Sequence, residues 1–501
     1  MMGSSTTEHL DVLIIGAGLS GVGAAYRVQT ECPWAEYAVF ESRSSMGGTW
    51  DLFRYPGIRS DSDMFTLGYP FRPWSGEESI ASGPKILQYI KDTAAEFGID
   101  EKIRYRHRIV CAEWSSADAM WTITAERTDG TDTAGGDGET FELTCSFLYS
   151  CTGYYRYDQG YLPDFDGMSE FAGTIVHPQK WPEDLDYAGK NVVVIGSGAT
   201  AVTLIPSMAD RAGHVTMLQR SPTYVASLPG KNPVTAAVRR VLPAKWEGPT
   251  LKWMNALATQ GSYQLSRRRP ELMKRILRRG VERLLPDGYD VDTHFTPRYD
   301  PWDQRLCVVP DGDLFRAIRK GTASVVTDRI DRFTERGILL ESGRELEADI
   351  VVTATGLDVL FMGGIELFVD GDKVDPSTRL VYKGMMLEDV PNLAIAIGYT
   401  NASWTLKADL IAGYTTRLLN HLRHTGQDTC VPRNTDGRVE ADSSLLDLTS
   451  GYLTRAADRL PKSGSAFPWK VYQSYVKDFR ATKRSEVVDD VMCFSRTQGA
   501  G

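Results

Sequence analysis

The stretch DVLIIGAGLSGVGAAYRV, residues 11–28, decides the fold. A short apolar run rich in β-branched residues leads into a glycine-rich turn, and the turn opens an alanine-rich stretch. This order predicts a strand, a tight turn and a helix. A second stretch, NVVVIGSGATAVTLIPSM at 191–208, has the same order. Two such copies favour two dinucleotide-binding units over a chance occurrence of glycines.

The spacing within each turn has a physical reason. The spaced positions are Gly16, Gly18 and Gly21 in the first turn, and Gly196, Gly198 and Ala201 in the second. The first position makes the turn, the second lets the backbone approach a pyrophosphate, and the third keeps the helix close to the strand. The helix N-terminus then presents free N–H groups and a partial positive charge to the phosphates.

The strand that follows each turn indicates which nucleotide is bound. YAVFES ends with Glu41 before its serine, and an acid here accepts hydrogen bonds from ribose hydroxyls and repels a 2′-phosphate. The first unit is therefore expected to bind FAD or NAD. VTMLQRS instead ends in Arg220 and Ser221, which suit the 2′-phosphate of NADPH. A surface charge at a strand end is the alternative reading of Arg220.

The composition excludes several classes of protein. The chain has 501 residues and a net charge of −9, which argues against a general nucleic-acid binder. Seven scattered cysteines without a CxxC motif predict reduced thiols and a cytoplasmic protein. The first ten residues contain no signal-peptide pattern, and no apolar run is long enough to span a membrane. No histidine spacing indicates a metal site.

One basic segment has two alternative roles. RRRPELMKRILRRGVERLL, residues 267–285, has eight Lys or Arg and two Glu, with Leu and Ile at helical spacing. It could lie on a membrane surface as a peripheral contact, or it could be a solvated basic helix face.

We expect an α/β fold with two Rossmann-like domains and a helical insertion. The apolar segments at 147–155 and 346–359 mark the points where the chain crosses between the two units. The expected division is 1–152 for the first part of the FAD domain, 153–231 for the first part of the NADP domain, 232–290 for the insertion, 291–350 for the second part of the NADP domain, and 351–501 for the second part of the FAD domain with a C-terminal tail.

Two further segments carry distinctive residues. GGTWDLFRYPGIRSD, ending at Asp61, is too rich in glycine, proline and aromatic residues for a regular helix, and could lie along a flat ring system. FAGTIVHPQKWP, residues 171–182, contains no carboxylate or cysteine. It precedes the second glycine turn, so we read it as a joint between the two units rather than as an acid–base site. An aromatic-packed linker without any functional role is the alternative.

With the two turns, these segments resemble the class B flavoprotein monooxygenases, and within them the Baeyer–Villiger monooxygenases. FAGTIVHPQKWP is similar to the fingerprint F-x-G-x-x-x-H-x-x-x-W of that branch, carried here by Phe171, Gly173, His177 and Trp181. Related N- and S-oxidising enzymes have Tyr or Phe in place of that tryptophan. DPWDQRLC at 300–307 and GYTNASWTLKADL at 398–410 further resemble a mycobacterial subfamily that activates a thioamide prodrug.

The resemblance implies a reaction and its residues. NADPH would reduce FAD, and the reduced flavin would bind O₂ as a C4a-peroxide that oxidises a ketone or a thioether. Arg305 matches the catalytic arginine, and Asp61 matches the carboxylate that positions it. Gln304 replaces the lysine that many members carry before this arginine, so strict NADPH preference is open. The positions that match FAD contacts are Ser20, Glu41, Gly48, Thr49, Trp50, Asp51, Leu52, Asp61 and Ile109; those that match NADP contacts are Arg59, Ser60, Gly196, Ser197, Gly198, Ala199, Thr200, Ala201, Val202, Arg220 and Ser221.

Three other functions are alternatives to a Baeyer–Villiger monooxygenase. An S- or N-oxygenase with little ketone activity is the nearest alternative, and Trp181 argues against it. A disulfide or electron-transfer reductase would need a cysteine pair beside the flavin turn, which the sequence lacks. A nucleotide sensor without catalysis would not need both Asp61 and Arg305. We expect the substrate pocket to be formed by residues of the 232–290 insertion, of the region near Arg305 and of the GYTNASW turn at 398–404.

Overall fold

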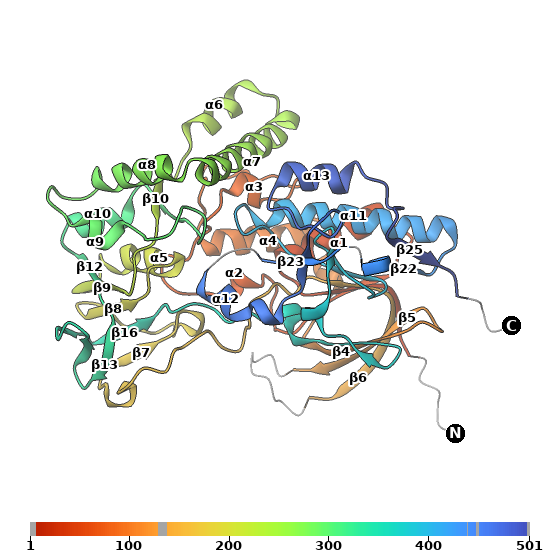
Figure 1. Cartoon of the computed structure of the whole chain (residues 1–501), viewed down its shortest axis with the longest axis horizontal. Coiled ribbons are helices and arrows are strands. Elements are labelled where there is room, and N and C mark those ends of the chain that lie inside the picture. The colour runs from red at the N-terminus through yellow and green to blue at the C-terminus, as the bar shows by residue number, and fades with distance from the viewer. Residues whose placement is uncertain (1–6, 129–137, 438, 447–449, 498–501) are drawn as a thin grey trace.

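The computed structural model describes residues 7–128, 138–437, 439–446 and 450–497. Figure 1 shows two sheets beside each other, each covered by helices, and a group of helices along one edge of the molecule. The first and the last described residues lie on the side of the first sheet. The expected α/β class with two Rossmann-like units is confirmed.

The first sheet is mixed. Its path is β18 (Asp372–Lys373), β17 (Glu366–Val369), β4 (His107–Ser115), β5 (Met120–Arg127), β6 (Thr140–Ser150), β1 (His9–Ile15), β2 (Tyr37–Glu41) and β3 (Ile103–Tyr105), and β21 (Leu393–Ile395) pairs with β6 outside this path. β1 runs parallel to β2 and β6, whereas β4, β5 and β6 form an antiparallel meander. A strand between two parallel neighbours is buried on both faces, which explains the nearly continuous apolar run of β1.

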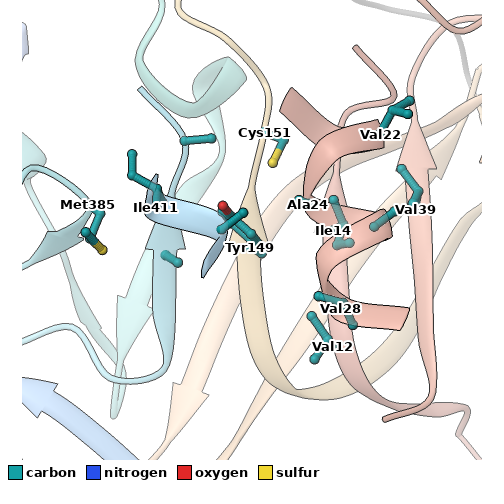
Figure 2. Close-up of a cluster of buried hydrophobic side chains, with 14 of the residues drawn as sticks. Val12, Ile14, Val22, Ala24, Val28, Val39, Tyr149, Cys151, Met385 and Ile411 are labelled. Carbon is teal, nitrogen blue, oxygen red and sulfur yellow. The ribbon is translucent and has the colours of Figure 1, made fainter. Parts of the chain in front are cut away.

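The core of the first unit lies between this sheet and two helices, α1 (Leu19–Glu31) and α11 (Trp404–Thr425). Val12 and Ile14 of β1 pack with Val39 of β2 and with Val22 and Val28 of α1. Figure 2 shows these side chains meeting between helix and sheet. Burying each one contributes about 1.5–3 kcal/mol to folding, and together they hold the start of α1 against the first glycine turn.

The second sheet is wholly parallel. Its order is β12 (Ala323–Thr327), β9 (His214–Gln219), β8 (Asn191–Ile195), β16 (Ile350–Thr353) and β7 (Thr174–Val176). α5 (Ala199–Met208) and α10 (Asp313–Arg319) pack against it. The fingerprint segment thus contributes the edge strand β7 to the sheet of the second unit.

Three helices leave the second unit between β10 (Val225–Leu228) and β11 (Cys307–Pro310), two strands that pair in parallel. They are α6 (Pro233–Val241), α7 (Ala244–Arg268) and α8 (Pro270–Glu282). Figure 1 shows them along one edge of the molecule, away from both sheets. α9 (Val291–Phe295) follows them and returns the chain to the second unit.

The remaining elements are short or lie near the C-terminus. The helices are α2 (Thr49–Leu52), α3 (Met64–Leu67), α4 (Gly83–Glu96), α12 (Gly451–Ala456) and α13 (Tyr475–Lys483), and the strands are β13 (Ile330–Thr334), β14 (Gly337–Leu340), β15 (Glu345–Glu347), β19 (Val381–Tyr382), β20 (Met386–Leu387), β22 (Thr429–Pro432), β23 (Ala441–Ser444), β24 (Lys462–Gly464) and β25 (Met492–Ser495). The loop expected at 47–61 contains one turn of helix, α2, and is otherwise irregular. Within the described ranges, we find no helix both long and apolar enough to cross a membrane.

Candidate active site

A cavity of about 450 Å³ lies where the two units meet. Its wall includes Gly16 and Gly48 from the first unit, Thr200 from the second glycine turn, and both Asp61 and Arg305. This volume is typical of a cofactor or small-molecule site. The tertiary structure therefore brings the two predicted catalytic residues and both predicted nucleotide turns to the same space.

The first glycine turn is shaped for close backbone approach. Gly16 has a φ of +99°, and a Cβ on it would lie 2.7 Å from the carbonyl oxygen of Cys151. A Cβ on Gly21 would lie 1.8 Å from the carbonyl oxygen of Gly16. α1 begins directly after the turn, at Leu19, and its first residues line the cavity. The free N–H groups at the N-terminus of α1 therefore lie beside the cavity.

Glu41 ends β2 at the cavity wall and is only 5% exposed. Its carboxylate accepts hydrogen bonds from the backbone N–H of Ala17 at 2.8 Å and of Arg43 at 3.0 Å. Burial raises the pKa of Glu41, although these hydrogen bonds act in the opposite direction. The carboxyl group is thus held in a fixed orientation beside the turn, where a ribose would lie.

The predicted flavin-contacting residues divide into two groups. Those that line the cavity are Ser20, Glu41, Gly48, Thr49, Trp50, Asp61 and Ile109. Asp51 is instead buried in ion pairs with Arg43 at 2.8 Å and with Arg54 at 3.2 Å, and Leu52 packs in the core of the second unit. The side chains of Asp51 and Leu52 therefore stabilise the loop behind the cavity rather than form its wall.

Asp61 and Arg305 form an ion pair, with 2.8 Å between Oδ2 and Nε. Burial alone would lower the pKa of Arg305, but the charge of Asp61 and the nearby hydroxyl of Tyr154 outweigh that effect and raise it. The guanidinium is therefore a permanent positive charge on the cavity wall. Arg305 could stabilise negative charge that develops on a reacting molecule in this cavity.

The turn that carries Arg305 is anchored to α7. Trp302 has a φ of +73° and packs edge-on against Tyr263, with 5.7 Å between the ring centroids. Asp303 forms an ion pair of 2.5 Å with Arg267. A strained backbone at a turn is maintained only when its neighbours hold it, so α7 helps to determine where Arg305 points.

The predicted NADP-contacting residues lie on two sides of the second turn. Arg59, Ser60, Ala199 and Thr200 line the cavity. Arg220 and Ser221 are exposed where β9 ends, and the Ser197 hydroxyl donates a hydrogen bond to the Ser221 carbonyl at 3.2 Å. Ala201 and Val202 are buried in the core of the second unit. Gly196 and Gly198 border α5, and Gln304 is half-buried next to Arg305.

The fingerprint residues lie outside the main cavity. Phe171 packs edge-on against Phe333, and a Cβ on Gly173 would lie 2.4 Å from the carbonyl oxygen of Asp349. Trp181 packs against the core of the second unit. His177 Nδ1 accepts a hydrogen bond from the backbone N–H of Gln179 at 3.2 Å.

Gln179 connects the fingerprint segment to the chain that leaves the first sheet. Its side-chain amide donates hydrogen bonds to the carbonyl oxygens of Arg156 at 2.8 Å and of Tyr157 at 2.9 Å. A Cβ on Gly160 would lie 2.0 Å from the His177 ring, so the imidazole covers this backbone closely. These contacts tie the edge of the second sheet to the crossover, which is a geometry suited to a joint.

Sequence reasoning missed the two adjacent tyrosines near Arg305, Tyr154 and Tyr155. Tyr154 stacks on Trp404, with 5.3 Å between their centroids, and its hydroxyl lies 2.9 Å from that of Tyr155. The indole N–H of Trp404 donates a hydrogen bond to the hydroxyl of Ser20 at 2.7 Å. The two adjacent tyrosines that follow β6 were the available signal, because loops at strand ends carry function.

The lining also corrects one expectation about the insertion. Residues 232–290 were expected to contribute pocket residues, yet none of the described residues in that range lines this cavity. The reason is that α7 packs behind Tyr399 and Ala402, which themselves form the wall. The GYTNASW turn does line the cavity, as expected, through Tyr399, Ala402 and Trp404.

Comparison with known proteins agrees with this geometry. A flavin-binding monooxygenase-like family model matches residues 77–238, and an NAD(P)-binding Rossmann-like domain model matches residues 14–77. The FAD-containing monooxygenase EthA of Mycobacterium tuberculosis is 52% identical over 98% of this chain and 98% of its own length. The chain belongs to the FAD-containing monooxygenases. The probable FAD-binding monooxygenase AlmA of Acinetobacter baylyi is 46% identical over 98% of this chain and 97% of its own.

Solved structures share the fold of this FAD-containing monooxygenase. A steroid monooxygenase bound to NADP has a TM-score of 0.75 and 20% identity, covering 97% of this chain and 100% of that one. OTEMO in complex with FAD and NADP has a TM-score of 0.68 and 20% identity, covering 85% and 86%. Family membership confirms that the chain is a flavoprotein monooxygenase with FAD as its flavin.

Proposed function

We propose that this enzyme is an NADPH-dependent Baeyer–Villiger monooxygenase that also oxidises sulfides. In the reaction, a ketone, O₂, NADPH and a proton give an ester or lactone, water and NADP⁺. With a thioether, the product is the sulfoxide. The single observation that carries the proposal is the ion pair of Asp61 and Arg305 in the wall of a cavity that both nucleotide turns border.

The residues of the cavity fit FAD. Gly16 and Gly21 leave no room for side chains, so the first turn stays tight and α1 stays close to it, and Gly18 lies at the cavity wall where a pyrophosphate would approach the backbone. Glu41 is oriented toward a ribose position by two backbone N–H groups. Ser60 is buried at the cavity wall, and its hydroxyl makes no hydrogen bond within the described residues, so a bound molecule could satisfy it. FAD, when bound here, supplies the oxygen-transfer chemistry.

Arg305 has two roles in this proposal. Its permanent charge stabilises negative charge that develops in the cavity during oxygen transfer. Its donors also suit the carboxamide of a nicotinamide. Asp61 orients the guanidinium through Nε, which leaves its other nitrogen atoms free to face the cavity.

The NADP side rests on Arg220 and Ser221. Both are exposed near the second glycine turn, and within the described ranges no carboxylate pairs with Arg220. A guanidinium without a carboxylate partner suits a 2′-phosphate. A cytoplasmic location fits the seven cysteines, which are all free thiols.

The proposal is tested with the FAD-loaded enzyme, NADPH, ¹⁸O₂ and matched ketones and thioethers, with products followed by mass spectrometry. One ¹⁸O gained by a ketone as an ester or lactone supports it. Sulfoxides or N-oxides alone would establish the alternative, an S- or N-oxygenating monooxygenase. Flavin reduction without any oxygenated product would exclude both.

Arg305→Ala gives the sharper comparison. We expect this variant to be reduced by NADPH but to lose about a hundredfold or more in oxygenated product, since an electrostatic contact made in the transition state is removed. Arg344→Ala, an exposed arginine in the turn between β14 and β15, is the matched control and should leave the rate unchanged. Normal oxygenation by Arg305→Ala would refute the catalytic assignment.

A further inference from the structure

The segment of α6, α7 and α8 differs in charge from the rest of the chain. Residues 232–285 contain twelve Lys or Arg and three Glu, without any Asp. Twelve positive minus three negative side chains give a formal charge of +9, so the other residues together carry −18 within the chain total of −9. A basic segment on an acidic protein indicates an anionic partner at that place.

The same segment exposes an unusual amount of apolar surface. Seven of the eleven large hydrophobic side chains exposed in the described residues belong to it, namely Val234, Val241, Trp246, Leu257, Leu265, Leu272 and Ile276. The segment makes up only about a tenth of the chain. Single exposed hydrophobic residues are ordinary, but such a concentration marks an interaction surface.

Helical periodicity places these residues on the side that faces away from the protein. Leu272 and Ile276 are one turn apart on α8, whereas Met273 and Val281 of the same helix are buried. On α7, Leu251, Ala256 and Ser266 are buried, and Trp246, Leu257 and Leu265 are exposed. Figure 1 shows the three helices at the edge of the molecule. We call the exposed apolar residues and the arginines between them the outer helical face.

Several arginines of the outer helical face keep an available charge. Among the described residues, Arg240, Arg268, Arg269 and Arg279 are exposed and form no ion pair. Other cations of the segment are paired; Arg239 with Glu247 and Lys274 with Asp300 are examples. Each of these four arginines lies within four residues of an exposed apolar side chain of the segment, so the remaining positive charge is close to the apolar surface.

We propose that the outer helical face binds the surface of an anionic lipid bilayer. Apolar side chains at helical spacing with arginines beside them are the chemistry of an interfacial helix, which buries one face among lipid acyl chains and places cations among the headgroups. A second copy of the chain would set a segment of charge +9 against its equal and meet repulsion. A nucleic acid would pair with the arginines but leave the apolar residues in water.

The position of this face adds a consequence for substrates. The inner side of α7 packs through Ala256 on Tyr399, and Tyr399 lines the cavity. The cavity wall and the outer helical face are thus separated by about one helix diameter, roughly 10 Å. An enzyme bound in this way takes up apolar substrates next to the bilayer in which they are concentrated.

The test is flotation of the FAD-loaded, full-length enzyme with two kinds of vesicle. One is phosphatidylcholine alone, and the other contains about one third phosphatidylglycerol. We expect binding to the anionic vesicles, little binding to the neutral ones, and loss of binding as NaCl rises to about 0.5 M. Equal binding to neutral vesicles, or no binding to anionic ones at low salt, would overturn the proposal.

Two variants locate the surface. Arg268→Glu/Arg275→Glu/Arg279→Glu should lower vesicle partitioning by about a hundredfold or more, because each arginine near an anionic surface contributes about fivefold. Leu257→Gln/Leu272→Gln/Ile276→Gln should lower it as well by removing the inserted side chains. The matched controls are Arg332→Glu/Arg344→Glu and Val488→Gln, which change exposed residues elsewhere and should bind as the wild type does.

Circular dichroism and flavin content show whether each variant is folded, independently of any oxygenation activity. If both outer-face variants fold and still float with anionic vesicles, the proposal is wrong. It is also wrong if light scattering shows that the face joins two copies, or if a DNA duplex binds the wild type and vesicles do not.

Discussion

Asp61 Oδ2 lies 2.8 Å from Nε of Arg305, which joins the loop after α2 in the first unit to the turn before β11. Each residue comes from a different part of the chain, and neither is part of a glycine turn. The pair exists only when the two units are docked, so it couples the docking of the units to the orientation of the positive charge in the cavity.

Asp61→Asn should test that coupling. The amide retains the size of the side chain but loses its charge, so Arg305 is oriented less firmly. We expect oxygenated product to fall by about ten- to a hundredfold, with FAD content unchanged and NADPH consumed without product. Steady-state assays that record NADPH and product together check this. Asp331→Asn, an exposed aspartate on β13, is the control. If Asp61→Asn still formed one product molecule for each NADPH consumed, Arg305 would not need the carboxylate to be oriented.

Gly21→Ala should prevent assembly of the first nucleotide turn. The added methyl would lie 1.8 Å from the carbonyl oxygen of Gly16, so the helix and the turn would have to separate. We expect loss of bound FAD and a lower melting temperature. Gly413→Ala in α11 is the matched control, since a Cβ there meets no atom within 4 Å. It should stabilise the fold by about 0.5–1 kcal/mol. Stoichiometric flavin in purified Gly21→Ala would contradict the prediction.

Arg220→Ala should change the nicotinamide preference. Without the guanidinium, the 2′-phosphate loses a charge-assisted contact, so KM for NADPH should rise by about ten- to a hundredfold and KM for NADH should change little. Gln304→Lys should have the opposite effect by adding a cation beside Arg305. Initial rates with both cofactors measure this. Equal effects of Arg220→Ala on the two cofactors would mean that Arg220 does not contact the phosphate.

His177 should make the stability depend on pH. Burial lowers its pKa below the ordinary value of about 6.5, and the charge of Lys180 acts in the same direction. The unfolded chain therefore binds a proton that the folded state does not, and the free energy of unfolding falls as the pH drops below about 6.5. In His177→Gln this part of the decrease should vanish.

Urea unfolding of the wild type and of His177→Gln at several pH values between about 5 and 7 tests the sign. Burial also lowers the pKa of His294, so His177→Gln/His294→Gln should flatten the curve further. Identical slopes for the wild type and His177→Gln would show that His177 binds its proton equally well in both states.

Local sequence patterns were sufficient to predict the strands, turns and helices of the two nucleotide-binding units. The strand, glycine turn and helix at 11–28 and at 191–208 form β1 with α1 and β8 with α5. Residues that are adjacent in the sequence build each turn, so no distant contact is needed to recognise it. The insertion at 232–290 was expected to be helical, and α6, α7 and α8 lie within it.

The residues of the cavity wall were harder to predict from local sequence patterns. Tyr154 stacks on Trp404, and Trp404 in turn reaches Ser20 through its indole N–H. These three residues lie far apart in the chain, and each one taken alone is an ordinary aromatic or serine residue. The carboxylate of Asp51 pairs with Arg43 and Arg54 behind the wall, so its expected contact with the flavin stays a prediction.

The sequence by itself determined the two dinucleotide turns, the α/β class and the membership of a monooxygenase family, because these depend on residues close together in the chain. The family resemblance implied the pair of Asp61 and Arg305. Only the tertiary structure decided that this pair lies in the wall of a cavity between the two units, that α7 lies behind that wall, and that the outer helical face remains exposed. The physical reason is that ion pairs, cavities and exposed surfaces arise from the packing of distant segments, and packing depends on the whole chain.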